Sequence, residues 1–531
     1  MSESTADRWD VIVIGGALAG AATARLVLRR RPGARLLILE RTEEFKRRVG
    51  ESTVEISAYF LGRVMGLTDH LLQQHLPKQG MRFWAMNDAT TALDDCSEIG
   101  PGYNVRLPGY QVDRAVLDEH VLQLALQEGA AVRRPVKVKT VRLAAGGQQT
   151  VEWEAAGESR SATARWVVDA SGFAALLGRQ EGWHRPNPRH PTAACWTRWT
   201  GVKSWDDPVL AAKFPQWSAR CRAVRSSATN HLTGYGWWAW VIPLRGGDVS
   251  IGVTFDQRLC ALPPGGRLAD RLKALLLTHP AGRELFSAAV CRDHDVHFRS
   301  QLAYDSTTYA VDGAVLVGDA AAFMDPFYSP GMDWIAFSAS AAAALIDASL
   351  GGEPAAPLAA RHTLNFTRAY ERWFRALYQD KYYYLGDHEL MLIAFRLDLG
   401  MYYLGAVHHV FRHGAAGLEV PGFARPGAAG PAAFMALYNR RLAAIAQDRR
   451  RRGTWGRRNR RQYFPFTSYE FNARLVPRIA AAALHWAALE LREGWRTWFR
   501  PLSHAHSQSR LSAPALRGTA DLAAPLPARS R

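Results

Sequence analysis

The sequence predicts an α/β fold, in which a Rossmann-type dinucleotide-binding domain is interleaved with an antiparallel β-sheet substrate domain and followed by a mainly helical C-terminal region. Three observations support this prediction. Near the N-terminus, a short apolar run leads into a glycine-rich turn and a helix. Between residues 181 and 300, apolar and polar residues alternate, as in VSIGVTFD (249–256). After Gly351, apolar residues recur at helical spacing, as in FTRAYERWFRALYQDKYYYLG (366–386).

The N-terminal segment has the pattern of a dinucleotide site. WDVIVI (9–14) is a β-branched run typical of a buried parallel strand. GGALAG (15–20) makes the turn, AATARLVLRRR (21–31) continues as a helix, and LLILE (36–40) is a second strand that ends in an acid. This order brings a helix N-terminus against a pyrophosphate group.

Five residues of this segment are candidate nucleotide contacts. Gly15 allows the tight turn, and Gly20 allows the helix to pack closely on the strand. Ala17 stands where the motif has its second glycine, and its methyl group crowds the pyrophosphate slightly. Glu40 can accept hydrogen bonds from ribose hydroxyl groups, and Arg41 beside it is a further candidate.

Three later segments indicate which dinucleotide binds. WVVDASG (166–172) is a strand that ends at Asp169, and GAVLVGDAAA (313–322) is a strand that ends at Gly318 and Asp319. The Asp319 carboxylate can reach a ribityl hydroxyl group. Together with YQVDR (110–114), these segments resemble the FAD-binding domain of the class A flavin monooxygenase superfamily, of the p-hydroxybenzoate hydroxylase type. The resemblance implies bound FAD, with Arg114 near the flavin.

Three motifs narrow the resemblance. They are VGEST (49–53), WWAWVIP (237–243) and FMDPFYSPG (323–331). The second contains W-x-W-x-I-P and the third contains F-x-D-P-x-x-S-x-G. Over roughly residues 8–350, the chain resembles the flavin-dependent halogenases.

This resemblance implies a reaction and its cofactors. Reduced FAD, supplied by a separate flavin reductase, reacts with O2 to form a C4a-hydroperoxide, and halide attack then gives hypohalous acid. The acid travels to a lysine beside the aromatic substrate. LPKQGMRF (76–83) offers Lys78, five residues before Phe83. Burial would lower the pKa of this lysine and favour its reactive form; the alternative is a surface lysine after a proline turn.

The FMDPFYSPG turn is the predicted halide site. We expect backbone amides of Ser329, Pro330 and Gly331 to face a halide beside the flavin, although proline itself lacks an N–H group. Pro326 and Pro330 would stiffen the turn, and Gly331 would permit a backbone conformation that side chains forbid. The alternative is a turn that contacts FAD without binding halide, as in related hydroxylases.

Aromatic residues are expected to separate the flavin from the substrate. Trp238 and Trp240 alternate on one face of a strand, and Pro243 and Phe83 complete the expected partition. Ordinary core packing would give the same alternation. The full set of expected FAD contacts is Gly15, Ala17, Gly20, Glu40, Arg41, Arg114, Asp169, Gly318, Asp319, Pro326 and Gly331.

The chain departs from the tryptophan halogenases at the substrate site. Their glutamate three residues before the last glycine of the turn is Tyr328 here, so an electron-rich phenol or pyrrole is the expected substrate, either free or on a carrier protein. The proline common after G-E-S-T is replaced by Val54-Glu55. Asp333 is interpreted as a helix N-terminal acid rather than a pocket acid.

Composition limits the partners and the compartment. The formal net charge is +18, and ten arginines fall between Arg440 and Arg461. This segment is either a solvated face or a surface for an acidic carrier protein or an anionic membrane; no nucleic-acid module accompanies it. Five scattered cysteines predict a reducing cytoplasm and no metal site. We expect neither a signal peptide nor a membrane-spanning segment.

These predictions define four regions and three function classes. The FAD-binding domain is expected at 8–180 and 295–350, the substrate-domain sheet at 181–294, the helical region at 351–502 and a disordered tail at 503–531. The leading function is halogenation of an electron-rich aromatic in specialised metabolism. The alternatives are a flavoprotein monooxygenase or dehydrogenase without halide chemistry, and a flavin-binding accessory protein.

Overall fold

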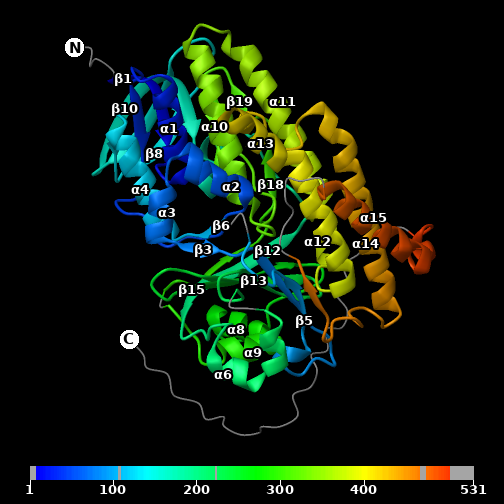
Figure 1. Cartoon of the computed structure of the whole chain (residues 1–531). Coiled ribbons are helices and arrows are strands. Elements are labelled where there is room, and N and C mark those ends of the chain that lie inside the picture. The colour runs from blue at the N-terminus through cyan, green and yellow to red at the C-terminus, as the bar shows by residue number, and fades with distance from the viewer. Residues whose placement is uncertain are drawn as a thin grey trace, which may run out of the picture.

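A computed structural model of the chain describes residues 7–105, 109–221, 224–292, 294–466, 474–500 and 502 (Figure 1). The predicted tail at 503–531 lies outside the described residues. Two large sheets and a C-terminal layer of helices make up the fold, which confirms the predicted α/β class with a helical C-terminal region.

The first sheet is the Rossmann-type sheet. Its parallel strands run in the order β20-β10-β1-β2-β7, with antiparallel additions from β19, β8 and β9. The strands are β1 (Asp7–Ile14), β2 (Leu36–Leu39), β7 (Ala131–Arg133), β8 (Lys137–Arg142), β9 (Gln149–Ala155), β10 (Glu158–Asp169), β19 (Ala310–Val311) and β20 (Ala314–Leu316). Helix α1 (Leu18–Arg30) packs against α4 (Arg114–Gln127) and α10 (Pro330–Leu350). Pairing of Ile14 with Asp169, and of Asp169 with Leu316, brings three strand ends to one edge of the sheet.

The second sheet forms the floor under this edge. Its order is β16-β12-β15-β14-β13-β4-β5-β21, with β17 beside β12. The strands are β4 (Met81–Ala85), β5 (Ser97–Gly100), β12 (Thr192–Thr200), β13 (Thr229–Gly234), β14 (Trp237–Pro243), β15 (Val249–Asp256), β16 (Val290–Cys291), β17 (His297–Arg299) and β21 (Tyr463–Pro465). Helices α6 (Pro208–Lys213), α8 (Leu268–Thr278) and α9 (Pro280–Phe286) lie on its far side (Figure 1).

Strand pairing crosses the residue ranges expected for the domains. Strands β12 to β15 are antiparallel, as expected for 181–294. However, β4 and β5 come from within 8–180, and β21 comes from within 351–502. The pairings β13 with β4 and β21 with β5 are parallel. The sheet is thus mixed, and because strand β17 falls within 295–350, its strands come from all four of the predicted ranges that precede the tail.

The C-terminal region is helical and covers one side of both sheets (Figure 1). Its main helices are α11 (Ala355–Trp373), α12 (His388–Tyr402), α13 (His408–His413), α14 (Ala429–Arg451) and α15 (Leu475–Arg492). Shorter elements elsewhere are α2 (Glu55–Tyr59), α3 (Thr68–Gln74), α5 (Leu176–Gln180), α7 (Pro215–Ala219), β3 (Leu76–Lys78), β6 (Gly109–Gln111), β11 (His184–Pro186) and β18 (Tyr304–Ser306). Strand β3 pairs with β6, and β11 pairs with β18.

Two helical stretches are long and apolar enough to cross a membrane, which differs from the expectation of none. They are Pro330–Leu350, with a mean hydropathy of 1.2, and His388–Leu418, with a mean hydropathy of 1.5. Of their most apolar windows, 72% and 83% of the residues are buried inside the protein. Because core helices have the same length and composition, these stretches are weak evidence for a membrane span.

Most of the arginine-rich segment is exposed, but two of its ten arginines are not. Arg449 is buried and donates hydrogen bonds to Asp387, Glu389 and Glu493 at 2.5–3.0 Å. Arg441 is half-buried and pairs with Glu490 of α15 at 2.8 Å. These two arginines join α14 to its neighbouring helices, whereas the other eight lie on the surface.

Candidate active site

The glycine turn after β1 has the expected close contacts. Gly15 has a φ of +102°, and its N–H group donates to the Leu39 carbonyl at 2.8 Å. A Cβ atom added to Gly20 would overlap the Gly15 carbonyl oxygen, so only glycine lets α1 approach this closely. Ala17 precedes the first turn of α1 in an extended conformation. The turn therefore presents backbone N–H groups beyond the sheet edge, as a pyrophosphate site requires.

Glu40 and Asp169 both hold backbone in place. Glu40 accepts hydrogen bonds from the N–H groups of Gly16 at 2.7 Å and Thr42 at 2.8 Å. Asp169 is fully buried and accepts from Ser171 at 2.9 Å and Leu177 at 2.8 Å. Its carboxylate does not line the cavity described below, so the structure places Asp169 behind the cofactor loop rather than at the cofactor. Arg41 is exposed.

A large cavity lies between the Rossmann-type domain and the second sheet. It contains about 1000 Å³ of space free of protein atoms. Its wall brings together Val49, Gly50, Glu51, Ser52, Arg114, Phe173, Ala194, Trp196, Thr229, His231, Trp238, Trp240, Ile242, Arg299, Leu302, Asp319, Phe323, Pro326, Ser329, Pro330, Gly331, Met332 and Ile335. Eight predicted site residues from four separate segments lie on this one cavity: Arg114, Trp238, Trp240, Asp319, Pro326, Ser329, Pro330 and Gly331.

The cavity wall contains charged groups next to the glycine turn. Arg114 begins α4 and is held by Asp118 at 2.9 Å. Burial raises the pKa of Asp319 to about 6, even though Arg114, Arg299 and Arg48 favour its charged form. Gly318 has a φ of +57° and donates to the Ser338 hydroxyl at 2.9 Å. These contacts fix the direction in which Asp319 points along the cavity edge.

These features fit FAD. The cavity wall combines aromatic side chains such as Trp238 and Trp240 with the charged groups of Arg114 and Asp319, as a flavin ring with a polar tail requires. A Cβ atom added to Gly331, on the cavity wall, would meet no protein atom within 4 Å. The space next to the Gly331 backbone is therefore open for a planar ring, and Arg114, Asp319 and the glycine turn supply the polar contacts.

The FMDPFYSPG turn is strained, but not where the sequence predicted. Asp325 is fully buried; one carboxylate oxygen accepts from the Phe327 N–H at 2.8 Å, and the other lies 2.7 Å from His190 Nε2. Tyr328 and Ser329 have positive φ angles of 67° and 56°. Gly331 lies within the first turn of α10, so its expected unusual conformation is wrong. Glycine at this position instead leaves space in the cavity, which a side chain would fill.

The start of α10 lies at the wall of the large cavity. Pro330 occupies the first helical position, where a missing N–H group costs nothing. The next N–H groups of the first turn have no partner within the helix. Because Gly331 and Met332 line the large cavity, these N–H groups lie at its wall. Of the three predicted amides, Pro330 has no N–H group and the Ser329 N–H donates to the Pro326 carbonyl at 3.0 Å. Gly331 and Met332 are the residues whose N–H groups lie at the cavity wall.

Aromatic side chains form a wall on one side of the large cavity. Trp238 contacts Phe327 at 5.1 Å between ring centroids, and Phe83 stacks on His231 at 4.7 Å. Trp238 Nε1 donates to the Tyr382 hydroxyl at 3.0 Å, and Tyr382 donates to Asp325 at 2.9 Å. These two hydrogen bonds connect the aromatic wall to Asp325 of the FMDPFYSPG turn. Pro243 is only half-buried and does not line the cavity.

Lys78 is buried at the end of β3, which excludes the surface alternative. It is 2% exposed, and its Nζ atom donates to Ser52 Oγ at 2.8 Å and to the Thr53 carbonyl at 2.7 Å. Burial lowers the pKa of Lys78 to about 8, although Glu55 and Asp333 favour the charged form. A lysine with this pKa can exchange its proton near neutral pH.

A second, smaller cavity lies on the other side of the turn. It contains about 440 Å³ and shares Pro330 with the large cavity. Its wall consists of Val54, Glu55, Met81, Tyr328, Pro330, Asp333, Trp373, Leu377, Tyr378, Phe395, Asp398, Leu399 and Tyr402. Lys78 stands between the two cavities, because its partner Ser52 lines the large one while Val54, next to its partner Thr53, lines the small one.

Several site residues were missed by sequence reasoning. Asp333 lines the small cavity, so its interpretation as only a helix N-terminal acid is wrong. Glu51 is held by Arg198 at 2.6 Å at the wall of the large cavity, and burial raises its pKa to about 7. Its place in the VGEST motif was an available signal. Asp398 and Tyr402 come from α12, where no motif marks them.

The glycine turn, the FAD-sized cavity and the buried lysine define a flavin-dependent oxidoreductase. Residues 93–372, which are more than half of the chain, match the sequence profile of the tryptophan halogenase family. The protein belongs to this family of flavin-dependent halogenases, and FAD is the cofactor that its residues fit.

Individual relatives agree with this assignment. The flavin-dependent halogenase chlA of Dictyostelium discoideum is 27% identical over 373 residues, covering 63% of this chain and 59% of the relative. Sulochrin halogenase gedL of Aspergillus terreus is 26% identical over 70% of this chain and 69% of its own length. The crystal structure of halogenase PltM has a TM-score of 0.70 with 22% identity, covering 90% of this chain and 96% of that one. At this identity the structural likeness shows the fold alone.

Proposed function

We propose that this protein halogenates an electron-rich aromatic compound, phenolic or pyrrolic, with reduced FAD, O2 and a halide ion. The observation that carries the proposal is the place of Lys78. It is a buried amine between a cavity that fits FAD and a cavity lined by aromatic and acidic side chains. Neither a hydroxylase nor a dehydrogenase needs a buried lysine at the passage between cofactor and substrate.

The large cavity would hold the cofactor and the halide. FAD, when bound, supplies the oxidising power that converts halide and O2 into hypohalous acid. Gly15, Gly20 and Asp319 would contact its phosphate and ribityl parts. The N–H groups at the start of α10, next to Ser329, would hold the halide by their partial positive charge.

Lys78 would receive the oxidised halogen and present it to the ring. An ammonium group can donate a hydrogen bond to the oxygen of hypohalous acid, which makes the halogen more electrophilic. An amine can instead form a haloamine. With a pKa of about 8, Lys78 is mainly an ammonium at pH 7 but can lose its proton at small cost.

The aromatic wall would keep the substrate away from the flavin. Phe83, Phe327 and Tyr328 lie within 6.3 Å of one another between ring centroids, on the route between the two cavities. A ring held behind this wall would be out of reach for direct oxygen transfer. Only a small oxidant such as hypohalous acid would pass to Lys78.

The small cavity supports a single-ring or two-ring aromatic substrate. It is lined mainly by apolar side chains, with Tyr328 where tryptophan halogenases carry a glutamate. Sulochrin halogenase is named for a phenolic substrate, and one PltM structure contains phloroglucinol. A phenol or pyrrole, free or attached to a carrier protein, is the substrate class we propose. The supply of reduced flavin by a separate reductase is part of the proposal, and the cytoplasm is its proposed location, since all five cysteines are free.

Product mass spectrometry tests this function. Purified protein would be mixed with FAD, a flavin reductase, NADH, oxygen, bromide and a panel of free and carrier-bound phenols and pyrroles. The expected result is a product with the bromine isotope doublet that depends on bromide and on the reductase. Oxygen insertion without bromine would contradict the proposal and make the protein a monooxygenase. Binding of flavin with no reduced-flavin turnover would favour an accessory role.

Replacing Gly331 by valine is expected to weaken binding of FAD by at least about 10-fold while leaving the melting temperature of the apoprotein within about 2 °C of wild type. The new side chain meets no protein atom and instead fills the space reserved for the flavin. Fluorescence titration with FAD and thermal unfolding measure the two quantities. Gly430→Val is the matched control, because Gly430 also lies in the first turn of a helix with nothing within 4 Å. Equal FAD affinity in both variants would contradict the placement of the flavin at Gly331.

A further inference from the structure

Three carboxylates line the small cavity, although the glutamate of the tryptophan halogenases is replaced by Tyr328. They are Glu55 of α2, Asp333 of α10 and Asp398 of α12. Electrophilic substitution releases a proton from the ring, and in a closed apolar cavity that proton needs an acceptor. Their hydrogen bonds show which of the three is available for this task.

Four hydrogen-bond donors already occupy the carboxylate of Asp398. Its two oxygens accept from Lys381 Nζ at 2.5 Å, Tyr438 at 2.7 Å, Tyr328 at 3.1 Å and Asn439 at 3.1 Å. Lys381 is itself buried, so the two charges neutralise each other. A carboxylate with four donors and a paired ammonium is a poor proton acceptor. Its role is to hold the hydroxyl group of Tyr328.

Glu55 is only half-buried, and Tyr403 donates to it at 2.7 Å. Its side chain is therefore partly open to solvent, unlike that of Asp333. Glu55 also lies two residues before Ser57, whose N–H group donates to Asp333 at 2.9 Å. It therefore belongs to the surroundings of Asp333 and contributes negative charge there.

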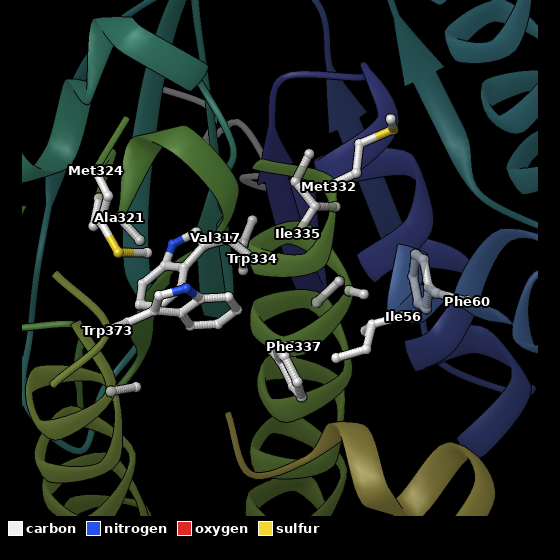
Figure 2. Close-up of a cluster of buried hydrophobic side chains, with 14 of the residues drawn as sticks. Ile56, Phe60, Val317, Ala321, Met324, Met332, Trp334, Ile335, Phe337 and Trp373 are labelled. Carbon is white, nitrogen blue, oxygen red and sulfur yellow. The ribbon is translucent and has the colours of Figure 1, made fainter. Parts of the chain in front are cut away.

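Asp333 is buried without a bonded cation. It is 1% exposed and accepts from the Ser57 N–H group at 2.9 Å and from the Tyr402 hydroxyl at 2.7 Å, both of which are neutral donors. Burial raises its pKa to about 7. Buried apolar side chains surround this part of α10: Figure 2 shows Trp334 beside Trp373 on one side of the helix, with Ile56 and Phe60 on the other.

Asp333 also acts on the lysine. Its charge and that of Glu55 favour the ammonium form of Lys78, so these carboxylates lie near the end of the cavity where Lys78 stands. In the same cavity wall, the Tyr378 hydroxyl and the Trp373 N–H lie near each other, and neither has a hydrogen-bond partner of good geometry. Two buried polar groups without well-formed hydrogen bonds at the wall of a cavity favour a ligand that carries a polar atom such as oxygen.

We propose that Asp333 is the catalytic base of this site, and that it takes the proton which the phenolic or pyrrolic ring releases when it is halogenated. This assignment rests on the proposed function. The substrate oxygen or nitrogen would meet Tyr378 and Trp373, while the reacting carbon faces Lys78 and Asp333. Tyr328 then needs no acidic side chain, because the Asp333 carboxylate, five residues after it in the first turn of α10, replaces the missing glutamate.

The step balances in atoms and charge. The ring carbon bonds to the halogen of hypohalous acid as the halogen–oxygen bond breaks, and the Lys78 ammonium gives a proton to the departing hydroxide to form water. The C–H bond of the halogenated carbon then breaks, its electron pair restores the aromatic ring, and the proton goes to the Asp333 carboxylate. Transfer of that proton from Asp333 to the Lys78 amine restores both groups.

Asp333→Asn is the first test. The variant is expected to halogenate a simple phenol about 100-fold more slowly, while it forms hypohalous acid at the wild-type rate, measured by bromination of a diketone trap in solution. Asp347→Asn is the control, because Asp347 lies on the same helix but pairs with Arg31 at 3.0 Å outside both cavities. An Asp333→Asn enzyme with the wild-type rate on the phenol would overturn the proposal.

The pH profile separates a base from a structural residue. The groups facing Asp333 are Glu55 and Ser57 of α2, Tyr402 of α12, Tyr378 and Lys78. For wild type, kcat/KM for the phenol should rise as Asp333 loses its proton near pH 7 and fall as Lys78 loses its proton near pH 8. The rise should be absent in Asp333→Asn, and its persistence would overturn the proposal.

A milder variant covers the case in which Asp333→Asn fails to fold. Tyr402→Phe removes one hydrogen bond from the Asp333 carboxylate and should move the rising limb of the profile to higher pH by about one unit, because the charged form loses a donor. An unchanged limb would overturn the proposal. If wild type forms no hypohalous acid at all, the proposed function fails, which the trap assay shows without reference to Asp333.

Discussion

Lys78→Ala is expected to reduce halogenation of every ring substrate by at least about 1,000-fold, with FAD affinity unchanged. Lys78 is the buried amine whose partner Ser52 lines the large cavity, whereas the nearby buried Lys381 is already paired with Asp398 at 2.5 Å. Without it, hypohalous acid would have no group to orient its halogen toward the ring. Product mass spectrometry with bromide and FAD fluorescence titration measure the two effects.

Stability must be measured alongside the Lys78 variant. The substitution leaves the Thr53 carbonyl and the Ser52 hydroxyl without their donor, which costs about 1–3 kcal/mol of the free energy of unfolding. Lys78→Met keeps most of the side-chain volume and separates packing from chemistry. Lys213→Ala is the control, since Lys213 is exposed and pairs with Glu284 on the surface. Full activity of Lys78→Met would show that the Lys78 amine takes no part in the reaction.

Gly20→Ala is expected to abolish FAD retention and to lower the free energy of unfolding by about 3 kcal/mol or more. The added methyl group would overlap the Gly15 carbonyl oxygen and lie 3.0 Å from the Val13 side chain. The helix would have to move away from β1, which would open the phosphate-binding turn. The absorbance spectrum of the purified protein and denaturant-induced unfolding measure these changes.

Gly33→Ala is the matched control for this substitution. Gly33 follows the same helix, but a Cβ atom there would meet nothing within 4 Å. Its free energy of unfolding should change by less than about 0.5 kcal/mol, as for most surface substitutions. If Gly20→Ala retained FAD and matched this control in stability, the close approach of α1 to the turn would not be needed for cofactor binding.

Local patterns predicted the nucleotide half of the site well. A strand, a glycine turn and an acid lie within about 30 residues, so their geometry depends on short-range sterics that each sequence position carries with it. The VGEST, WWAWVIP and FMDPFYSPG motifs converge on one cavity, as predicted. Two details were wrong even here. Asp169 supports the loop from behind, and positive φ angles fall at Tyr328 and Ser329 instead of Gly331.

The substrate half of the site was much harder to predict from the sequence. Its cavity combines Glu55 of α2 and Asp333 of α10 with Asp398 and Tyr402 of α12, which are separated by up to 347 positions in the chain (402 minus 55). Helix α12 has no motif, and its apolar length resembles that of many core helices. The pairing of Arg449 with three acids was equally hidden, because charge in a sequence does not show which partners burial will bring to it.

The sequence by itself determined that this protein binds a dinucleotide on a Rossmann-type domain and carries the motifs of a flavin-dependent halogenase. Those properties follow from backbone conformations and spacings within single segments. Only the tertiary structure decided that Lys78 is buried between two cavities and that Asp333 faces the smaller one. Burial and the distances between segments remote in the chain set the pKa of each group, and both arise only when the helical layer packs over the sheets.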